Sequence, residues 1–479
     1  MMEALFKNLI SNKVFFYLLS RYATFFLQFV VSLLLSARLG PYYLGVWGVY
    51  LVIHNYYYRL NLGIPYSSQV MLLQNVKDKQ RCSLIYFNAL VVMGYLILIA
   101  AISAIVLGRF SIAYLEKYNI SWQLYVLAAI ACVEYVNYLL VSLFRVYNQI
   151  YEIAFQQSIT VICQLGVLFF ARGEHLVNLL LFTLFASALS SLFLLLWRNR
   201  LSIKGCYIDK LLIKDILNKG WALFLYNTCF YFIMMSLRTI ISSDYSPEEF
   251  GNFSFAYTLS NAVMLLVEAV IFLVSPKMIA MYASADLEKI KANMKMVRFN
   301  YITLIHLLMY MALVVFPYVD KIFTQYTTIS SALVFVSLIL MAESFNMAFA
   351  QCLIARNQER SAALSSLVAF VVNLGGCIIL VKVFHVAYQY VMLASVLSMV
   401  VFFFMLFAFL KKEIGLSLKD DVLSWKLLVP YLVFLLTSII GVNISQYLII
   451  LFLLLNFKEV KKIGETVFLI LQKPNIVNI

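Results

Sequence analysis

The chain has 479 residues, of which 64% are hydrophobic and only 12% are charged, and its mean hydropathy is +0.92. Soluble domains contain about 25% charged residues, so this composition excludes a water-soluble globule, and its hydrophobicity also excludes a disordered chain. The net charge of +14 would suggest a nucleic-acid partner in a soluble protein. In a membrane protein the same charge records orientation instead, and no nucleic acid is expected.

Apolar runs between charged loops predict membrane-spanning helices along the whole chain, because one span needs about 20 mostly apolar residues. The first run has no small-residue cleavage site after it, so it is interpreted as a span and not as a signal peptide. The first six predicted spans are 14–36, 46–73, 82–107, 123–145, 154–171 and 175–197. Six more follow a basic linker, at 221–242, 251–275, 299–318, 328–354, 361–381 and 386–410.

The region 427–457 is interpreted as a final pair of spans, 427–442 and 445–457, with one long span as the alternative. The segment Gly441-Val442-Asn443 is a plausible turn between them. With the N-terminus in the cytoplasm, 27 of the 36 lysines and arginines lie on the cytoplasmic side, six lie on the opposite side and three lie inside spans. This bias predicts that both termini are cytoplasmic, and it favours the pair because one span would place four lysines of the tail outside.

An internal duplication is visible in two pairs of segments. The sequence EYVNYLLVSLFRVYNQ at 134–149 matches ESFNMAFAQCLIARNQ at 343–358, with Glu134 and Asn137 opposite Glu343 and Asn346 at an offset of 209. The segment PYYLG at 41–45 matches PEEFG at 247–251 at an offset of 206. Each match falls six helices later, and an even number of helices per repeat gives two halves of the same orientation.

These patterns predict an all-α integral membrane protein of about 14 transmembrane helices. Two pseudo-symmetric six-helix bundles surround a central cavity, and a C-terminal helix pair follows them. The predicted domains are an N-terminal bundle at 1–200, a cytoplasmic linker at 201–220, a C-terminal bundle at 221–412, and the helix pair with a cytoplasmic tail at 413–479.

Polar residues recur at helical spacing in spans 1, 2, 7 and 8, which are repeat mates, and such stripes usually face a bundle interior or a cavity. The candidate substrate-binding residues are Arg21, Gln28, Asn55, Arg59, Asn227, Arg238 and Asn261. Arg59 lies near the middle of its span. For Arg21 and Arg238 the alternative is snorkelling to lipid head groups, and for Gln28, Asn227 and Asn261 it is bonding between helices.

Three carboxylates inside spans, Glu134, Glu268 and Glu343, are candidates for ion coupling. Each could bind a proton or a sodium ion, could neutralise a cavity arginine, or could hold helices together. These carboxylates would couple transport to a proton or sodium gradient, and no other cofactor is expected. His54 and His306 are interpreted as hydrogen-bonded packing residues.

Enzyme chemistry has no signature in this sequence. Nucleotide-binding, zinc-hydrolase and nucleophile-elbow motifs are absent, so no enzyme activity and no bound cofactor are expected. The seven cysteines have no spacing typical of a disulfide framework or a zinc site, and they are interpreted as small apolar residues.

The segments SARLGPYYLGVWGVY at 36–50 and LNLGIPYSSQVMLL at 60–73, with the helix number and the arginines in spans 1, 2 and 7, resemble one superfamily. It is the multidrug/oligosaccharidyl-lipid/polysaccharide (MOP) exporters, and within it the Wzx-type polysaccharide flippases. The resemblance extends through about residue 410. It implies translocation of undecaprenyl-pyrophosphate-linked oligosaccharides for O-antigen or lipopolysaccharide synthesis across the bacterial cytoplasmic (inner) membrane. It also implies membrane lipids, a polysaccharide polymerase and a chain-length regulator as partners.

Related lipid II flippases hold the pyrophosphate with arginines in helices 1, 2 and 8, and Arg21 and Arg59 match the first two. The eighth span here contains Glu268 and no arginine, so Arg238 is the expected substitute. Guanidinium groups suit a pyrophosphate because they bind it bidentately. The alternatives are a cation-coupled drug or metabolite antiporter, against which the arginine stripe argues, a lipid II flippase, and a non-transporting scaffold.

Overall fold

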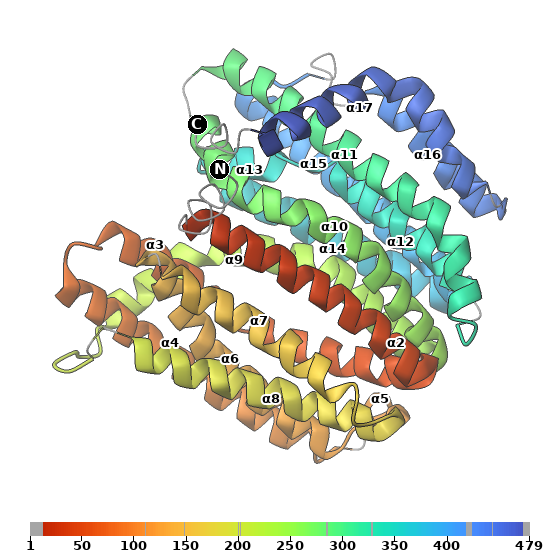
Figure 1. Ribbon diagram of the computed structural model, residues 1–479. Coiled ribbons are helices and arrows are strands. Elements are labelled where there is room, and N and C mark those ends of the chain that lie inside the picture. The colour runs from red at the N-terminus through yellow and green to blue at the C-terminus, as the bar shows by residue number, and fades with distance from the viewer. Residues whose placement is uncertain are drawn as a thin grey trace, which may run out of the picture. The chain divides into compact units, whose positions relative to one another are not determined.

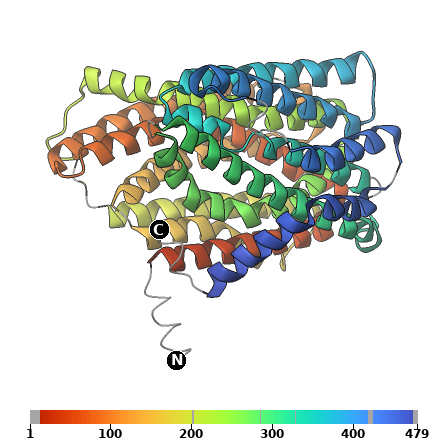
Figure 2. The ribbon, with the colours of Figure 1, turned by 90° about the horizontal axis from the view of Figure 1, so that it is seen from above.

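The computed structural model describes residues 13–110, 112–147, 149–199, 201, 203–283, 286–326, 329–417, 424–442 and 444–472. Within these residues the chain forms α-helices and one short 3-10 helix, and no strand. Nine of the described helices are long and apolar enough to cross a membrane. The all-helical, multi-pass prediction is confirmed. Figure 2 shows the long helices within each part of the chain lying close to one common direction.

The chain divides into two compact units, each of which is described by itself. Unit 1 comprises Met1–Thr228 and Tyr245–Gly251, and unit 2 comprises Cys229–Asp244 and Asn252–Ile479. The domain boundaries expected from the sequence remain a prediction.

Unit 1 is a bundle in which α8 packs along α6 and α7 (Figure 1). Its helices are α2 (Lys13–Arg59), α3 (Ile64–Gln74), α4 (Lys79–Leu107), α5 (Ala113–Lys117), α6 (Trp122–Val146), α7 (Ile150–Val167), α8 (Gly173–Arg198), the first part of α9 (Lys210–Asp244) and the start of α10 (Pro247–Tyr282). Helix α2 contains the first predicted span and part of the second, which are separated by a kink at Gly40 with φ 68°.

Unit 2 contains the rest of α9 and α10 and the helices that follow them. These are α11 (Leu287–Ile322), α12 (Ile329–Ser344), α13 (Phe349–Ala355), α14 (Glu359–Lys382), α15 (Tyr388–Ile414), α16 (Trp425–Ile440), η2 (Ser445–Tyr447) and α17 (Leu448–Gln472). The final region thus forms two helices, as the charge distribution favours. They are joined by an ion pair of 2.7 Å between Lys426 Nζ and Glu459 Oε1.

Equivalent contacts in the two units support the duplication. Asn137 on α6 donates to the carbonyl of Ala188 on α8 at 2.9 Å. Its repeat mate Asn346, which follows α12, donates to the carbonyl of Met399 on α15 at 3.4 Å. Both amides are buried. A buried amide at the same repeat position therefore holds the fourth and sixth helices of each repeat together. Asn148, another residue of the match, lies outside the described residues.

The two proline–glycine segments of the duplication lie against each other within unit 1. A Cβ atom added at Gly45 would lie 2.0 Å from the carbonyl oxygen of Pro247, and one added at Gly251 would lie 1.9 Å from that of Pro41. Both distances are far inside van der Waals contact. Glycine is required at both positions because each backbone approaches the other segment too closely for any side chain.

Two predicted spans are broken, which the hydropathy pattern does not reveal. The span predicted at 46–73 ends as α2 at Arg59 and resumes as α3 at Ile64, with Leu62 and Gly63 at positive φ. The span predicted at 328–354 breaks between α12 and α13, where Ala348 has φ 70°. Each break frees backbone groups that need other partners, as in discontinuous membrane helices.

Arg298 supplies the partners at the second break. Its Nη1 donates to the carbonyls of Phe345 at 2.7 Å and Met347 at 2.8 Å, and its guanidinium lies 3.8 Å from the ring centre of Phe349. The span predicted at 299–318 leaves this arginine in the cytoplasmic loop before it. Helix α11 begins at Leu287 instead, and Arg298 is 3% exposed, so it is a structural residue of unit 2.

The expected orientation can be checked at the start of α10. Ser246 lies between the predicted spans 221–242 and 251–275, on the expected outer side, but its hydroxyl accepts from the backbone N–H of Glu249 at 3.2 Å and so caps the helix. Glu248 beside it is exposed. With Glu248→Cys, we expect a membrane-impermeant maleimide to label the intact cell from outside. Labelling only after permeabilisation would contradict an N-terminus in the cytoplasm.

Candidate cationic pocket

The break between α2 and α3 forms one side of a pocket of about 210 Å³ within unit 1. Helix α6 and the middle of α9 form the rest of its wall. The residues that line it are Tyr58, Arg59, Asn61, Gly63, Pro65, Tyr66, Gln69, Tyr138, Ser142, Arg145, Phe224, Asn227 and Thr228. Two of these residues are arginines and none is acidic, so the wall that they form has a net positive charge.

The local sequence explains why Arg59 lies at the end of a helix. Asn61 closes a turn there, because its side chain donates to the carbonyl of Tyr58 at 2.9 Å and accepts from the N–H of Gly63 at 3.0 Å. Gly63 takes the left-handed conformation, and Pro65 stands in the first turn of α3. Proline is favoured in the first turn because its missing N–H would have no helical partner there.

The pocket therefore combines two kinds of positive charge. Gly63 and Pro65 line it, so the N-terminus of α3, an eleven-residue helix, opens onto it. A helix N-terminus has a partial positive charge that favours an anion. The N–H of Ile64 donates to the carbonyl of Asn61 at 3.1 Å and Pro65 has no N–H, so the start of α3 contributes mainly through this charge. Arg59 is half-buried and Arg145 is exposed, and both can donate to the same ligand. This arrangement is suited to binding a compact anion.

Sequence reasoning found Arg59 and Asn227 but missed Arg145. Arg145 lies at the predicted end of the fourth span and was counted as a cytoplasmic loop charge. The spacing of the residues on α6 could have identified it, because Tyr138, Ser142 and Arg145 are separated by four and three residues and so lie on one face of the helix. All three line the pocket.

His54 and Glu134 form a pair on the same two helices. His54 Nε2 lies 2.8 Å from Glu134 Oε2, and the two side chains are 15% and 26% exposed. The ring of Tyr58 lies 6.2 Å from that of His54 and 5.0 Å from that of Tyr138, centre to centre. The two tyrosines line the pocket, so they connect it to the pair. Glu134 is predicted as an ion-coupling candidate and His54 as a packing residue, and in the structure the two side chains form one pair.

The other candidates in unit 1 do not line the pocket. Arg21 lies with its guanidinium 4.4 Å from the ring centre of Phe25 on its own helix. Gln28 is exposed in the unit, and Asn55 is half-buried one turn before Arg59. Their roles as substrate-binding residues remain predictions.

Unit 2 contains the remaining candidates. The guanidinium of Arg238 on α9 lies 5.5 Å from the ring centre of Tyr257 on α10, and Asn261 is half-buried one turn further along α10. Glu343 is half-buried in the last turn of α12, directly before the break. Glu268 lies in α10, but its side chain is outside the described part of the structure. The roles of these four residues also remain predictions.

Metal chemistry finds no support in the described residues, where no group of three histidine, cysteine or acidic side chains could hold an ion. All seven cysteines are free thiols, and Cys82, Cys229, Cys352 and Cys377 are buried. The residues that are placed together in unit 1 offer positive charge, neutral hydrogen-bonding groups and the contact between His54 and Glu134.

Comparison with known proteins places this geometry in a class of fold. No family model and no curated protein matches the chain. A solved inward-facing multidrug resistance MATE family transporter of the MOP superfamily is 13% identical, with a TM-score of 0.68, over 83% of this chain and 98% of that chain. An outward-facing one is 15% identical, with a TM-score of 0.61, over 85% and 94% of the two chains.

A third solved structure is a MOP superfamily transporter from Pyrococcus furiosus Vc1 (DSM3638), described with a reverse polarity of its binding pocket that suggests a different function. It is 14% identical, with a TM-score of 0.58, over 84% of this chain and 95% of that chain. The protein therefore has the fold of these solved transporters. At these identities the likeness shows the fold, and the cargo has to be argued from the site.

Proposed function

We propose that the protein is a flippase that moves undecaprenyl-pyrophosphate-linked oligosaccharide repeat units from the cytoplasmic to the outer leaflet of a bacterial inner membrane. The observation that supports this most is the pocket of unit 1, where Arg59, Arg145 and the N-terminus of α3 meet without an acidic residue in the wall. A pyrophosphate is the anionic part of such a lipid, and arginine binds phosphate oxygens in pairs.

The size and wall of the pocket support a role in binding the head group only. Its volume of about 210 Å³ is below the roughly 300–1,000 Å³ of sites for drug-sized ligands. A whole glycolipid does not fit such a space, whereas a pyrophosphate group does. Asn61, Gln69 and Ser142 add neutral hydrogen-bonding groups beside the two arginines. In this proposal the polyprenyl chain stays in the lipid while the head group crosses.

Movement of the head group is proposed to occur by alternating access, in which two halves of the same orientation rock against each other. Arg21 and Arg238 would then contact the anion at other stages of the cycle. Both termini would be cytoplasmic, and the partners would be membrane lipids, a polysaccharide polymerase and a chain-length regulator.

A direct test reconstitutes the purified chain into liposomes with a fluorescent undecaprenyl-pyrophosphate-linked oligosaccharide. We expect the chain to move the label across the bilayer, as detected by quenching from one side. The same assay with lipid II and with a lipophilic drug cation separates the alternatives. Movement of the cation with none of the glycolipid would contradict the flippase proposal.

The cation-coupled drug or metabolite antiporter is the second candidate. The solved neighbours described as multidrug transporters favour it, and so does the His54–Glu134 pair, which is a plausible proton site. The cationic wall of the pocket argues against a cationic cargo because like charges repel. A lipid II flippase would use the same pyrophosphate chemistry and would differ in the sugar.

The His54–Glu134 pair is proposed to couple transport to a proton gradient. A proton that binds this pair changes the charge next to Tyr58 and so changes the field in the pocket. Arg59 follows Tyr58 in the chain, and Tyr138 is one turn from Glu134 on α6. Tyr58, Arg59 and Tyr138 line the pocket and therefore lie between it and the pair on α2 and α6.

Glu134→Gln, alone and with Glu343→Gln, tests the coupling. We expect the single variant to keep its fold and to lose at least tenfold of gradient-driven transport, since the amide cannot ionise. Transport should be measured in liposomes with and without an imposed proton or sodium gradient. Glu174→Gln is the matched control, because Glu174 is exposed in the same unit. An unchanged response to both gradients in the double variant would exclude these carboxylates as coupling sites.

A further inference from the structure

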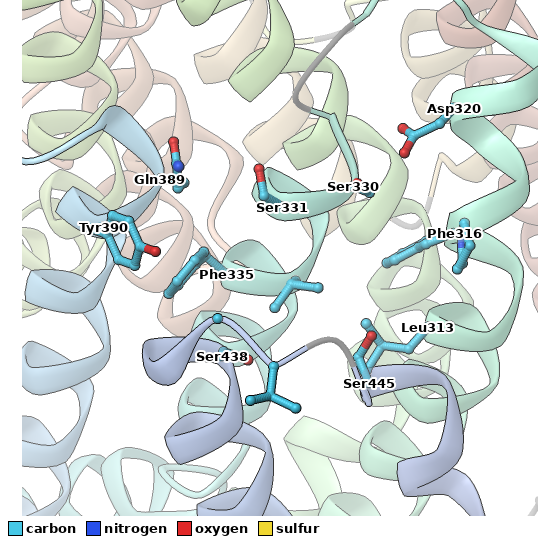
Figure 3. Close-up of a pocket in the computed structure, with 14 residues that line it drawn as sticks. Leu313, Phe316, Asp320, Ser330, Ser331, Phe335, Gln389, Tyr390, Ser438 and Ser445 are labelled. Atoms are coloured by element: carbon cyan, nitrogen blue, oxygen red, sulfur yellow. The ribbon is translucent and has the colours of Figure 1, made fainter.

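Unit 2 contains a second pocket, of about 250 Å³, where four helices meet at one end (Figure 3). Helix α11 ends there, α12 and α15 begin there, and α16 ends there, with η2 closing the wall. The orientation expected from the charge distribution places this end on the outer side of the membrane. The pocket shares no residue with the cationic pocket of unit 1.

The charge of this pocket is opposite to that of the first. Asp320 is the one charged residue among the fourteen that line it. Its Oδ1 is buried and accepts no hydrogen bond from any residue in the described part of the chain. Because a carboxylate accepts hydrogen bonds and does not donate them, a ligand that satisfies this oxygen must offer N–H or O–H groups.

The remaining wall has a polar side and an aromatic side. Figure 3 shows Ser330, Ser331 and Gln389 at the level of Asp320, with the rings of Tyr390, Phe335 and Phe316 next to them. The rings of Phe335 and Tyr390 pack edge to face, with their centres 5.3 Å apart. A ligand in this space therefore meets hydroxyl and amide groups on one side and flat apolar surfaces on the other.

We propose that this pocket binds one sugar ring of a glycan on the outer side of the membrane. A sugar ring has hydroxyl groups that donate to a carboxylate and to an amide oxygen, and it has an apolar C–H face that packs on an aromatic ring. An anionic ligand is disfavoured, because none of the fourteen lining residues is basic. The identity of the glycan as the cargo's own rests on the proposed function, whereas the binding of a sugar ring does not.

The geometry also assigns a role to the C-terminal helices. Ser438 and Gly441 at the end of α16 and Ser445 in η2 complete the wall. Gly441 has φ 81°, a conformation that lets the chain turn sharply after α16. The helix pair that follows the two six-helix repeats therefore completes the wall of this site beside α11 and α12. A sugar held there would be retained after it reaches the outer side.

Ligand-observed NMR on the full chain in nanodiscs tests this proposal, with methyl glycosides of glucose, galactose and N-acetylglucosamine as probes. We expect saturation transfer to at least one glycoside, weakened about tenfold by Asp320→Asn, since hydrogen bonds to an ionised group are roughly twice as strong as neutral ones. Ser331→Phe, which fills the pocket, should remove the signal. Glu116→Gln, an exposed carboxylate of the other unit, should leave it unchanged.

Two results would overturn the site. One is a glycoside signal that Asp320→Asn and Ser331→Phe both leave intact although the variants melt like the parent protein. The other is binding of tetramethylammonium at Asp320 with no glycoside binding. The liposome assay on the same preparations separates this inference from the proposed function. Flipping without an Asp320-dependent glycoside signal overturns the sugar site alone, and an Asp320-dependent signal without flipping supports the site and overturns the flippase.

Discussion

Replacement of Arg59 and Arg145 together by alanine is expected to abolish glycolipid transport while the protein stays folded in the membrane. Hydrogen bonds to charged groups contribute about 1.5–3 kcal/mol each, so loss of one arginine should weaken pyrophosphate binding roughly 10- to 150-fold. Both arginines line one pocket and face one ligand, and we therefore expect the double variant to fall below detection. Transport in liposomes and surface polysaccharide in a complemented deletion strain are the measurements.

Three comparisons make this result specific to the pocket. Arg109→Ala removes an exposed arginine after α4 and should leave transport unchanged. Arg59→Lys keeps the charge but loses paired donation to phosphate, so its activity should lie between those of the parent and the alanine variant. Normal polysaccharide with Arg59→Ala and Arg145→Ala together would exclude this pocket as the head-group site.

Gly45→Ala and Gly251→Ala are expected to have the largest effects on stability. The added methyl group would overlap a carbonyl oxygen at 2.0 Å in the first case and 1.9 Å in the second. Overpacking typically costs 1–3 kcal/mol, and we expect about 3 kcal/mol or more here because the group in contact is backbone and cannot rotate away. The apparent melting temperature of the purified protein in detergent should fall by about 3 °C or more.

Gly94→Ala and Gly166→Ala are matched controls for these variants. A Cβ atom at either position meets nothing within 4 Å, and both glycines lie inside helices. Alanine is favoured over glycine in a helix by about 0.8–1.0 kcal/mol, so the controls should melt at the same temperature or higher. If Gly45→Ala melted like Gly94→Ala, the close contact between the two proline–glycine segments would be wrong.

Much of the fold was predictable because its signals are local. A span is a continuous apolar run, and its ends are marked by charges, so α4, α6, α8, α14 and α15 lie within a few residues of their predicted bounds. The duplication was also predictable, because two pairs of segments match in the sequence. The structure supports it, since Asn137 and Asn346 make equivalent hydrogen bonds in the two units. Helix breaks were missed because hydropathy averages over the few residues that interrupt a helix.

The site was predictable only in part, because its residues come from helices far apart in the sequence. Arg59 and Asn227 stood out as polar residues inside spans, and both line the pocket. Arg145 looked like a loop charge, and Arg298 looked like another. The structure separates them, because Arg145 faces a pocket and Arg298 binds the carbonyls of a broken helix.

The sequence by itself determined that this protein crosses a membrane many times, that it is built from a repeat, and that its excess positive charge lies mostly outside the predicted spans. These properties depend on composition and periodicity, which each segment has before it packs. Only the tertiary structure decided that Arg59 and Arg145 line one pocket, that His54 contacts Glu134, and that Asp320 lies in a pocket of the opposite charge. Contacts of this kind depend on which helix faces pack against each other. That pairing is decided only when the helices of each unit come together.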